Sequence, residues 1–182
     1  MAITLLNNTQ YPAQYTILKG QLVATSLTIV APGASVLVPA ESLYTVNAAT
    51  TLDGNLHTSA PLRVSPGVGF SAGIRQDAGL QTYMFEVLEI PSSGPNQLEF
   101  ESSCKSEVVF TILKNSRPLQ SIVLTEPFKK SILALSDTYS VRAVINGVTT
   151  DVATTNDPNA TITAVDDTAD SSAGYYTLRV SA

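Results

Sequence analysis

Histidine and cysteine, two side chains that often serve as general base or nucleophile, are scarce in this chain. Among its 182 residues there is one histidine, His57, and one cysteine, Cys104. Metal sites built from several histidines are therefore excluded. The one Gly-x-Ser-x-Gly sequence, residues 69–73, falls in a stretch that reads as a strand and lacks the helix that follows a nucleophile elbow. A nucleophilic cysteine needs a basic neighbour that lowers its pKa, but alternation along an extended chain points Lys105 away from Cys104. We therefore predict that the protein has no catalytic residue and is not an enzyme.

Carboxylate and amide side chains gather late in the chain, at Asp151, at residues 156–159 and at Asp166, Asp167 and Asp170. Ca²⁺ takes oxygen ligands of this kind in flexible geometry. Residues 156–159, Asn-Asp-Pro-Asn, resemble the acidic linkers of calcium-dependent adhesion domains. The spacing fits no EF-hand loop, however, and Asp and Asn also favour turns. The alternatives are a calcium site at Asp166, Asp167 and Asp170 or plain turn chemistry, and we expect no other cofactor.

Composition narrows the classes of partner. The net charge is −5 and the sequence has no basic stripe, which argues against nucleic acid because phosphate binding uses clustered Lys and Arg. No apolar run approaches the roughly 20 residues that span a bilayer, although contact with a membrane surface is compatible with this composition. The chain begins without a basic, signal-like segment. We expect a cytoplasmic protein, or one released by a non-classical route.

The elements that would position these residues repeat along the chain. Residues 15–19, Tyr-Thr-Ile-Leu-Lys, recur as residues 110–114, Phe-Thr-Ile-Leu-Lys, at an offset of 95. Collinear matches follow on both sides, and a two-residue gap then shifts the offset to 93, where residues 52–54 and 145–147 both end in Asp-Gly or Asn-Gly hairpin signals. On this alignment Cys104 corresponds to Thr9 and His57 to Thr150. Neither residue is shared by both copies, so the repeated unit does not depend on them.

Each copy has the pattern of an all-β domain. Val, Ile and Thr are frequent, helical periodicity is absent, and each copy contains about seven short alternating segments bounded by turn residues. We predict two tandem immunoglobulin-like, Greek-key β-sandwich domains, at residues 1–92 and 97–182, produced by internal duplication. Residues 90–96, rich in Pro and Gly, form the predicted short linker.

These features favour a recognition or self-assembly protein that binds a glycan, a protein or itself, as a monomer or a homo-oligomer. A calcium-dependent adhesion module is one alternative. A membrane-active toxin is another, because the uncharged stretch bounded by Leu22 and Leu37 could form an amphipathic hairpin in lipid. Residues 3–17, which read as strand, Asn turn and strand, also resemble the start of small bacterial insecticidal β-sandwich proteins. That resemblance implies a β-sandwich with toxin activity.

Overall fold

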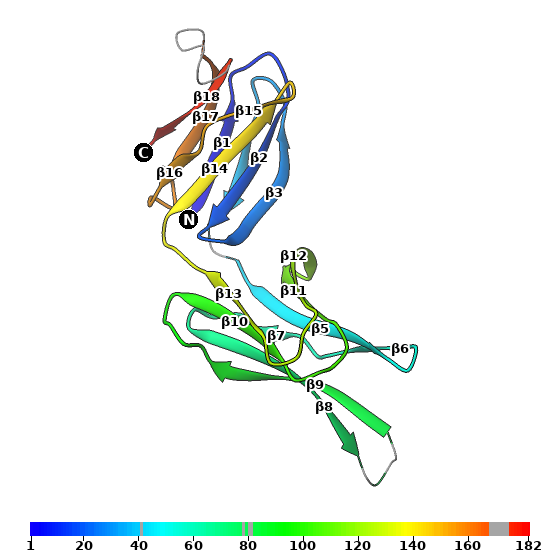
Figure 1. The fold of residues 1–182 in the computed structure, drawn as a ribbon. Helices are drawn as coiled ribbons and strands as arrows, with labels where there is room; N and C mark the ends of the chain where they lie inside the picture. The colour runs from blue at the N-terminus through cyan, green and yellow to red at the C-terminus, as the bar shows by residue number, and fades with distance from the viewer. Residues whose placement is uncertain (41, 78, 80–81, 168–174) are drawn as a thin grey trace. The chain divides into compact units, whose positions relative to one another are not determined.

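The fold is all-β, as predicted from the pattern of the sequence. The computed structural model describes residues 1–40, 42–77, 79, 82–167 and 175–182. These residues form eighteen β-strands and no helix (Figure 1). Within this part of the chain there is accordingly no helix that could cross a membrane.

The strands assemble into two compact units that do not follow the order of the sequence. Unit 1 combines Met1–Ser42 with Ser136–Ala182, and unit 2 is the continuous segment Leu43–Leu135. The predicted domains 1–92 and 97–182 are therefore not the compact units, because each contributes strands to both units. The predicted linker 90–96 lies inside unit 2, where it connects two strands of one sheet. The chain passes from one unit to the other after Ser42 and again after Leu135.

Unit 1 consists of two sheets packed through a common core. Side chains alternate between buried and partly exposed along its central strands, and the buried face of each sheet supplies core residues such as Ile3 and Leu5 from one and Tyr15 and Val141 from the other. One sheet has the order β18 (Tyr176–Ser181), β17 (Thr161–Asp166), β1 (Ala2–Asn7), β4 (Ser35–Pro39). The other has the order β15 (Val148–Thr149), β14 (Tyr139–Ile145), β2 (Ala13–Lys19), β3 (Leu22–Val30), and β16 (Ala153–Thr155) also pairs with β14.

Unit 2 has the same plan, with an aromatic core. The ring of Phe100 lies 5.6 Å from that of Phe70 in its own sheet and 5.2 Å from that of Phe110 in the facing sheet. One sheet has the order β13 (Lys130–Ala134), β10 (Gln97–Ser102), β8 (Val68–Asp77), β9 (Thr82–Pro91). The other has the order β12 (Arg117–Leu124), β11 (Val108–Lys114), β5 (Tyr44–Leu52), β6 (Asn55–Thr58), and β7 (Leu62–Arg63) also pairs with β5.

Strands at equivalent places in the two units are related by the sequence offset. The first sheet of each unit contains a central parallel pair, β1 with β17 in unit 1 and β10 with β8 in unit 2. In each second sheet the antiparallel partners are β2 with β14 and β11 with β5. In each of these four central pairs, a strand of the first half of the chain is thus paired with a strand of the second half. The partners in these pairs are not adjacent in the sequence, so local patterns do not reveal the pairing.

The same hydrogen bonds also recur at the hairpins. The backbone N–H of Ala143 donates to Thr150 Oγ1 at 3.0 Å, and the N–H of Ala48 donates to Ser59 Oγ at 2.9 Å. The N–H groups of Thr150 and Ser59 donate back to those alanine carbonyls at 2.9 Å. Ser59, and not His57, therefore takes the place of Thr150. The predicted offset of 93 is wrong here because hairpin β5–β6 is two residues longer in each strand than hairpin β14–β15.

Candidate functional site

The histidine and the cysteine both lie in unit 2 but make no joint site. His57 is on β6, cross-strand from Thr50, and is partly exposed. Cys104 is in the β10–β11 connection and only 4% exposed. Its backbone N–H donates to Ser102 Oγ at 3.0 Å, as the N–H of the equivalent Thr9 donates to Asn7 Oδ1 at 3.0 Å. Cys104 therefore fills a buried turn position that both units build.

The predicted calcium ligands are described only in part. Asp166 ends β17, and the backbone N–H of Asp167 donates to the carbonyl of Tyr175 at 2.9 Å. Asp170 lies outside the described residues, so the three-residue calcium site stays a prediction. Within the described ranges, no three His, Cys, Asp or Glu side chains are grouped to hold a metal ion. A thermal-shift titration of the full chain with CaCl₂ tests the site.

The two ends of the uncharged stretch 22–37 lie in different sheets of unit 1. Leu22 begins β3 and is 5% exposed, whereas Leu37 lies on β4 and is 67% exposed. A turn between the strands is closed by the N–H of Ala34, which donates to the carbonyl of Ala31 at 3.0 Å. In this fold the stretch is two edge strands joined across the sandwich.

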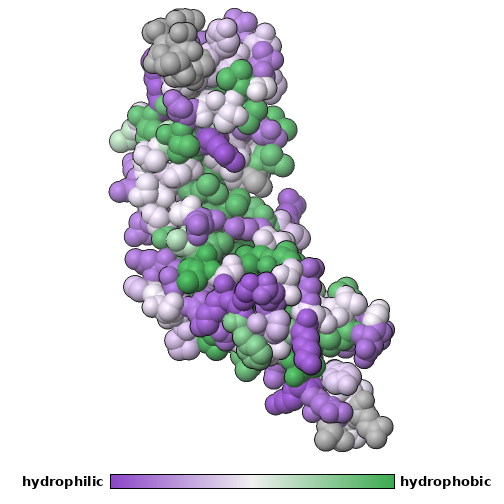
Figure 2. Space-filling view, viewed as in Figure 1, coloured by the Kyte–Doolittle hydropathy of each residue, from purple (hydrophilic) through white to green (hydrophobic). Residues whose placement is uncertain are grey.

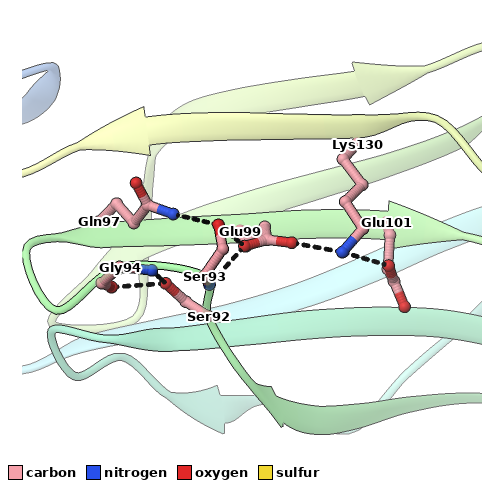
Figure 3. Close-up of polar contacts among 7 residues, drawn as sticks. All are labelled: Ser92, Ser93, Gly94, Gln97, Glu99, Glu101 and Lys130. Atoms are coloured by element: carbon pink, nitrogen blue, oxygen red, sulfur yellow. Dashed lines mark hydrogen bonds and ion pairs between the residues drawn. The ribbon is translucent and has the colours of Figure 1, made fainter.

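Glu99 is the most completely buried acidic side chain in the described structure, with 1% of its surface exposed. Alternation along β10 places Leu98 and Phe100 in the core and turns Glu99 to the opposite face, where the β9–β10 connection covers it. Its Oε2 accepts hydrogen bonds from Ser93 N–H and Oγ, both at 2.7 Å, and its Oε1 lies 2.6 Å from Lys130 Nζ (Figure 3). Both carboxylate oxygens are thereby occupied.

A glycine, Gly69, lies next to Glu99 in the neighbouring strand, within the parallel pair β8–β10. A Cβ at Gly69 would come within 2.9 Å of Ile90 Cγ1 and 3.2 Å of Glu99 Cβ, which is too close for both neighbours. The absence of a side chain at Gly69 thus leaves room for Ile90 and Glu99 on the two neighbouring strands.

The contacts of Glu99 fix its charge. The hydrogen bond from Lys130, followed by those from Ser93, lowers the pKa of Glu99 to about 2. Glu99 and Glu101 in turn raise the pKa of Lys130, whose Nζ lies 3.3 Å from Glu101 Oε2. A carboxylate that stays ionised and fully hydrogen-bonded is a poor general base. Glu99 therefore has a structural role: its hydrogen bonds to Ser93 hold the β9–β10 connection against the sheet.

The register of the strands brings four connections to one end of unit 2. Val108, at the start of β11, pairs with Thr50 near the end of β5 and with Leu124 at the end of β12. Lys130, at the start of β13, pairs with Glu101 near the end of β10, and β10 runs parallel to β8. The β5–β6, β8–β9, β10–β11 and β12–β13 connections therefore share an end, which we call the hairpin end.

A hollow of about 360 Å³ opens at the hairpin end. It forms where hairpins β5–β6 and β8–β9 continue beyond the neighbouring strands, and Figure 1 shows the long β8–β9 hairpin extending past β10. Its volume is within the range of small-molecule sites. The lining residues are Leu52, Asp53, Ile74, Tyr83, Ser103, Cys104, Lys105 and Ser106. A second hollow of similar size lies nearby and shares Ser106.

The lining combines an aromatic ring with charged and hydroxyl groups. Tyr83 is about half exposed, so its ring is accessible at the rim. Asp53 occupies the turn of hairpin β5–β6, at φ 49°. In the described part of the chain no ion pair engages Asp53 or Lys105. Turn chemistry predicts the Asp53-Gly54 hairpin, but the hollow itself has no signal in the sequence because its two walls come from opposite halves of the chain.

Apolar side chains are exposed at equivalent places on the edge strands of both units. Leu37 on β4 corresponds to Ile132 on β13. Leu37 pairs with Thr4 and Ile132 pairs with Glu99, and Thr4 and Glu99 are related by the offset of 95. Ile29 on β3 and Val123 on β12 match in the same way. All four are more than half exposed. Figure 2 shows hydrophobic and hydrophilic residues interspersed over the viewed face.

Comparison with known proteins gives no family assignment: no family model, no curated protein and no solved structure significantly matches the chain.

Proposed function

We propose that this chain is a non-catalytic recognition protein that binds a glycan in the hollow at the hairpin end of unit 2. The hollow and its mixed lining are the observation that carries the proposal. A pyranose ring has an apolar face, which the accessible ring of Tyr83 can cover, and a rim of hydroxyl groups. Asp53 can accept hydrogen bonds from those hydroxyls, while Ser103, Lys105 and Ser106 can donate to them.

The residues that line the hollow also favour ligand binding over hydrolysis of the ligand. Hydrolysis of a glycosidic bond normally uses two carboxyl groups on either side of the bond. Asp53 is the one carboxylate among the described residues that line this hollow. His57 is absent from the lining of both described hollows. A ligand held here would meet one carboxylate, with no second carboxyl group among the described lining residues to complete a hydrolytic pair.

We further propose that the two units descend from one duplicated immunoglobulin-like, Greek-key sandwich. The shared strand order, the offset of 95 and the matching Ala48–Ser59 and Ala143–Thr150 hydrogen bonds support this origin. Hairpin β5–β6 has two more residues in each strand than hairpin β14–β15 of unit 1. This extra length places Leu52 and Asp53 at the hollow of unit 2. Binding would thus be a property that unit 2 acquired after duplication.

A glycan array of defined mono- to hexasaccharides, probed with the full chain labelled at its amino terminus, tests the recognition proposal. We expect one structural class to bind, and we expect Tyr83→Ala and Asp53→Asn each to weaken that binding by at least about tenfold. Tyr11→Ala is the matched control, because Tyr11 is a similarly exposed tyrosine in unit 1. Binding to no glycan, or binding that Tyr83→Ala leaves unchanged, would contradict the proposal.

Self-association is a second candidate function, and the paired edge residues favour it. An exposed apolar edge strand is a template for pairing with another chain, and here Leu37 and Ile132 repeat that feature in both units. Sedimentation of wild type over a range of concentrations should then show a dimer that Leu37→Lys and Ile132→Lys dissociate. Val152→Lys, at an exposed valine that lies outside the strands, is the control. A monomer at all concentrations would exclude this function.

Exposed Leu27, Ile29 and Leu37 also support the membrane-active reading of the stretch 22–37. That reading predicts release of an entrapped dye from anionic or zwitterionic liposomes at neutral or acidic pH. Intact liposomes under every condition would eliminate it.

A further inference from the structure

Phe128 has a backbone conformation that phenylalanine rarely adopts. It lies in the β12–β13 connection with φ +62°, in the left-handed region. The equivalent residue in unit 1 is Gly33, with φ +71°. The N–H of Gly33 donates to the carbonyl of Asn7 at 2.7 Å, and the N–H of Phe128 donates to that of Ser102 at 2.7 Å. Both turns also have a proline immediately before the left-handed residue, so the turn needs a glycine-like residue and unit 2 has a phenylalanine.

The side chain of Phe128 contributes little stabilisation that would offset this backbone strain. It is 80% exposed, the largest exposed fraction of any large apolar residue in the described structure. Burial of apolar surface is the main way in which a phenyl ring stabilises a fold, and this ring is hardly buried. An outlier conformation and an exposed aromatic ring at one residue together point to a role in binding.

The position of Phe128 connects it to the hollow. Its N–H is bonded to Ser102, and the next residues, Ser103 and Cys104, line the hollow. In the order of the sheets, the β12–β13 connection lies on one side of the β10–β11 connection, while hairpins β5–β6 and β8–β9 lie on the other. Across the hairpin end, therefore, Tyr83 and Phe128 flank the β10–β11 connection.

We propose that Phe128 is a second aromatic contact of the glycan site, so that the ligand is an oligosaccharide lying across the hairpin end. This inference rests on the proposed glycan recognition. One sugar residue occupies the hollow beside Tyr83, and the chain continues over the β10–β11 connection until a further residue stacks on Phe128. Lys129 Nζ lies 2.6 Å from Glu126 Oε1, so an exposed ion pair joins the residues on either side of Pro127 and Phe128.

Phe128→Gly separates binding from folding, because it removes the ring and relieves the strain at once. We expect this variant to bind the preferred oligosaccharide at least about tenfold more weakly while binding the monosaccharide of the hollow as well as wild type does. We expect its melting temperature to rise by about 2–4 °C as the left-handed residue becomes glycine. Leu27→Gly is the matched control, since Leu27 is an exposed apolar residue at φ +55° in unit 1. It should gain stability with no change in glycan affinity.

Each other outcome has a distinct meaning. Equal affinity of wild type and Phe128→Gly for oligosaccharides, with Tyr83→Ala still defective, would overturn the role of Phe128 and leave the hollow as the whole site. A lower melting temperature of Phe128→Gly would assign the ring to folding and also overturn it. Absence of glycan binding by wild type would overturn the proposed function and this inference together.

Discussion

At the scale of single residues, Glu99 makes the stability of unit 2 depend on pH. Its folded pKa of about 2 is below the ordinary value of 4.5, so the unfolded chain takes up a proton first as the pH falls. The stabilisation from Glu99 is therefore complete above about pH 4.5 and is lost as the pH falls from there towards 2. The pH dependence from Lys130 has the opposite sign. Because the folded protein raises the pKa of Lys130, its stabilisation is complete below the ordinary lysine pKa and is lost as the pH rises above that value.

Urea unfolding of wild type and Glu99→Gln over the range from neutral to acidic pH checks this. We expect Glu99→Gln to unfold at lower urea at pH 7 and to show a smaller further loss on acidification than wild type. Glu126→Gln, which alters an exposed pair with Lys129, is the control and should follow wild type. If the stability of Glu99→Gln and that of wild type fell in parallel as the pH was lowered, the charge of Glu99 would not stabilise unit 2.

Tyr15 has a comparable structural role in unit 1. Its buried hydroxyl donates to the carbonyl of Leu6 at 2.7 Å and accepts from the N–H of Ala164 at 3.1 Å, joining both halves of the chain. Tyr15→Phe should destabilise unit 1 by about 1–3 kcal/mol, because both backbone groups lose their partner. Chemical denaturation measures this, with Tyr175→Phe, at an exposed tyrosine, as control.

Since burial raises the pKa of Tyr15 to about 12, wild type should also lose stability as the pH rises from 10 to 12.

At the scale of elements, local patterns predict strands and turns well. The alternation in residues 2–7 and 13–19 becomes β1 and β2, and the Asp53-Gly54 and Asn146-Gly147 signals become hairpin turns with positive φ at all four residues. Alternation also turns Glu99 away from the core, but its burial depends on the β9–β10 connection, whose Ser93 donates hydrogen bonds to it. The pairing of strands and the length of hairpin β5–β6 were beyond prediction, because both depend on contacts between distant segments.

The longer hairpin β5–β6 has a testable role in the site. Deleting residues 51, 52, 55 and 56 keeps the Asp53-Gly54 turn and gives the hairpin the length of β14–β15. We expect unit 2 to stay folded, as unit 1 does with the shorter hairpin, but to lose its glycan affinity. Cys104 should then react faster with a thiol reagent, because a wall of the hollow is removed. Unchanged thiol reactivity with retained binding would show that this hairpin does not form the hollow.

At the scale of the whole molecule, the two halves of the chain are interleaved, and the site depends on that arrangement. Leu52, Asp53, Ile74 and Tyr83 come from the first half, whereas residues 103–106 come from the second. The repeat correctly relates the strands to one another but leads to tandem domains, because sequence similarity cannot specify whether a half pairs with its own copy or with the other. Interleaving also predicts that residues 90–96 are no linker between separable bodies.

Cutting the chain within that segment tests the interleaving most directly. A protease site inserted between Gly94 and Pro95 is cleaved in the folded protein, and the product is analysed by size-exclusion chromatography and light scattering, with the uncut insertion variant as control. Interleaved halves should remain one particle of about 19.2 kDa, which separates into two fragments only in denaturant and retains glycan binding. Two fragments of about half that mass, separating without denaturant, would contradict the arrangement and the site built on it.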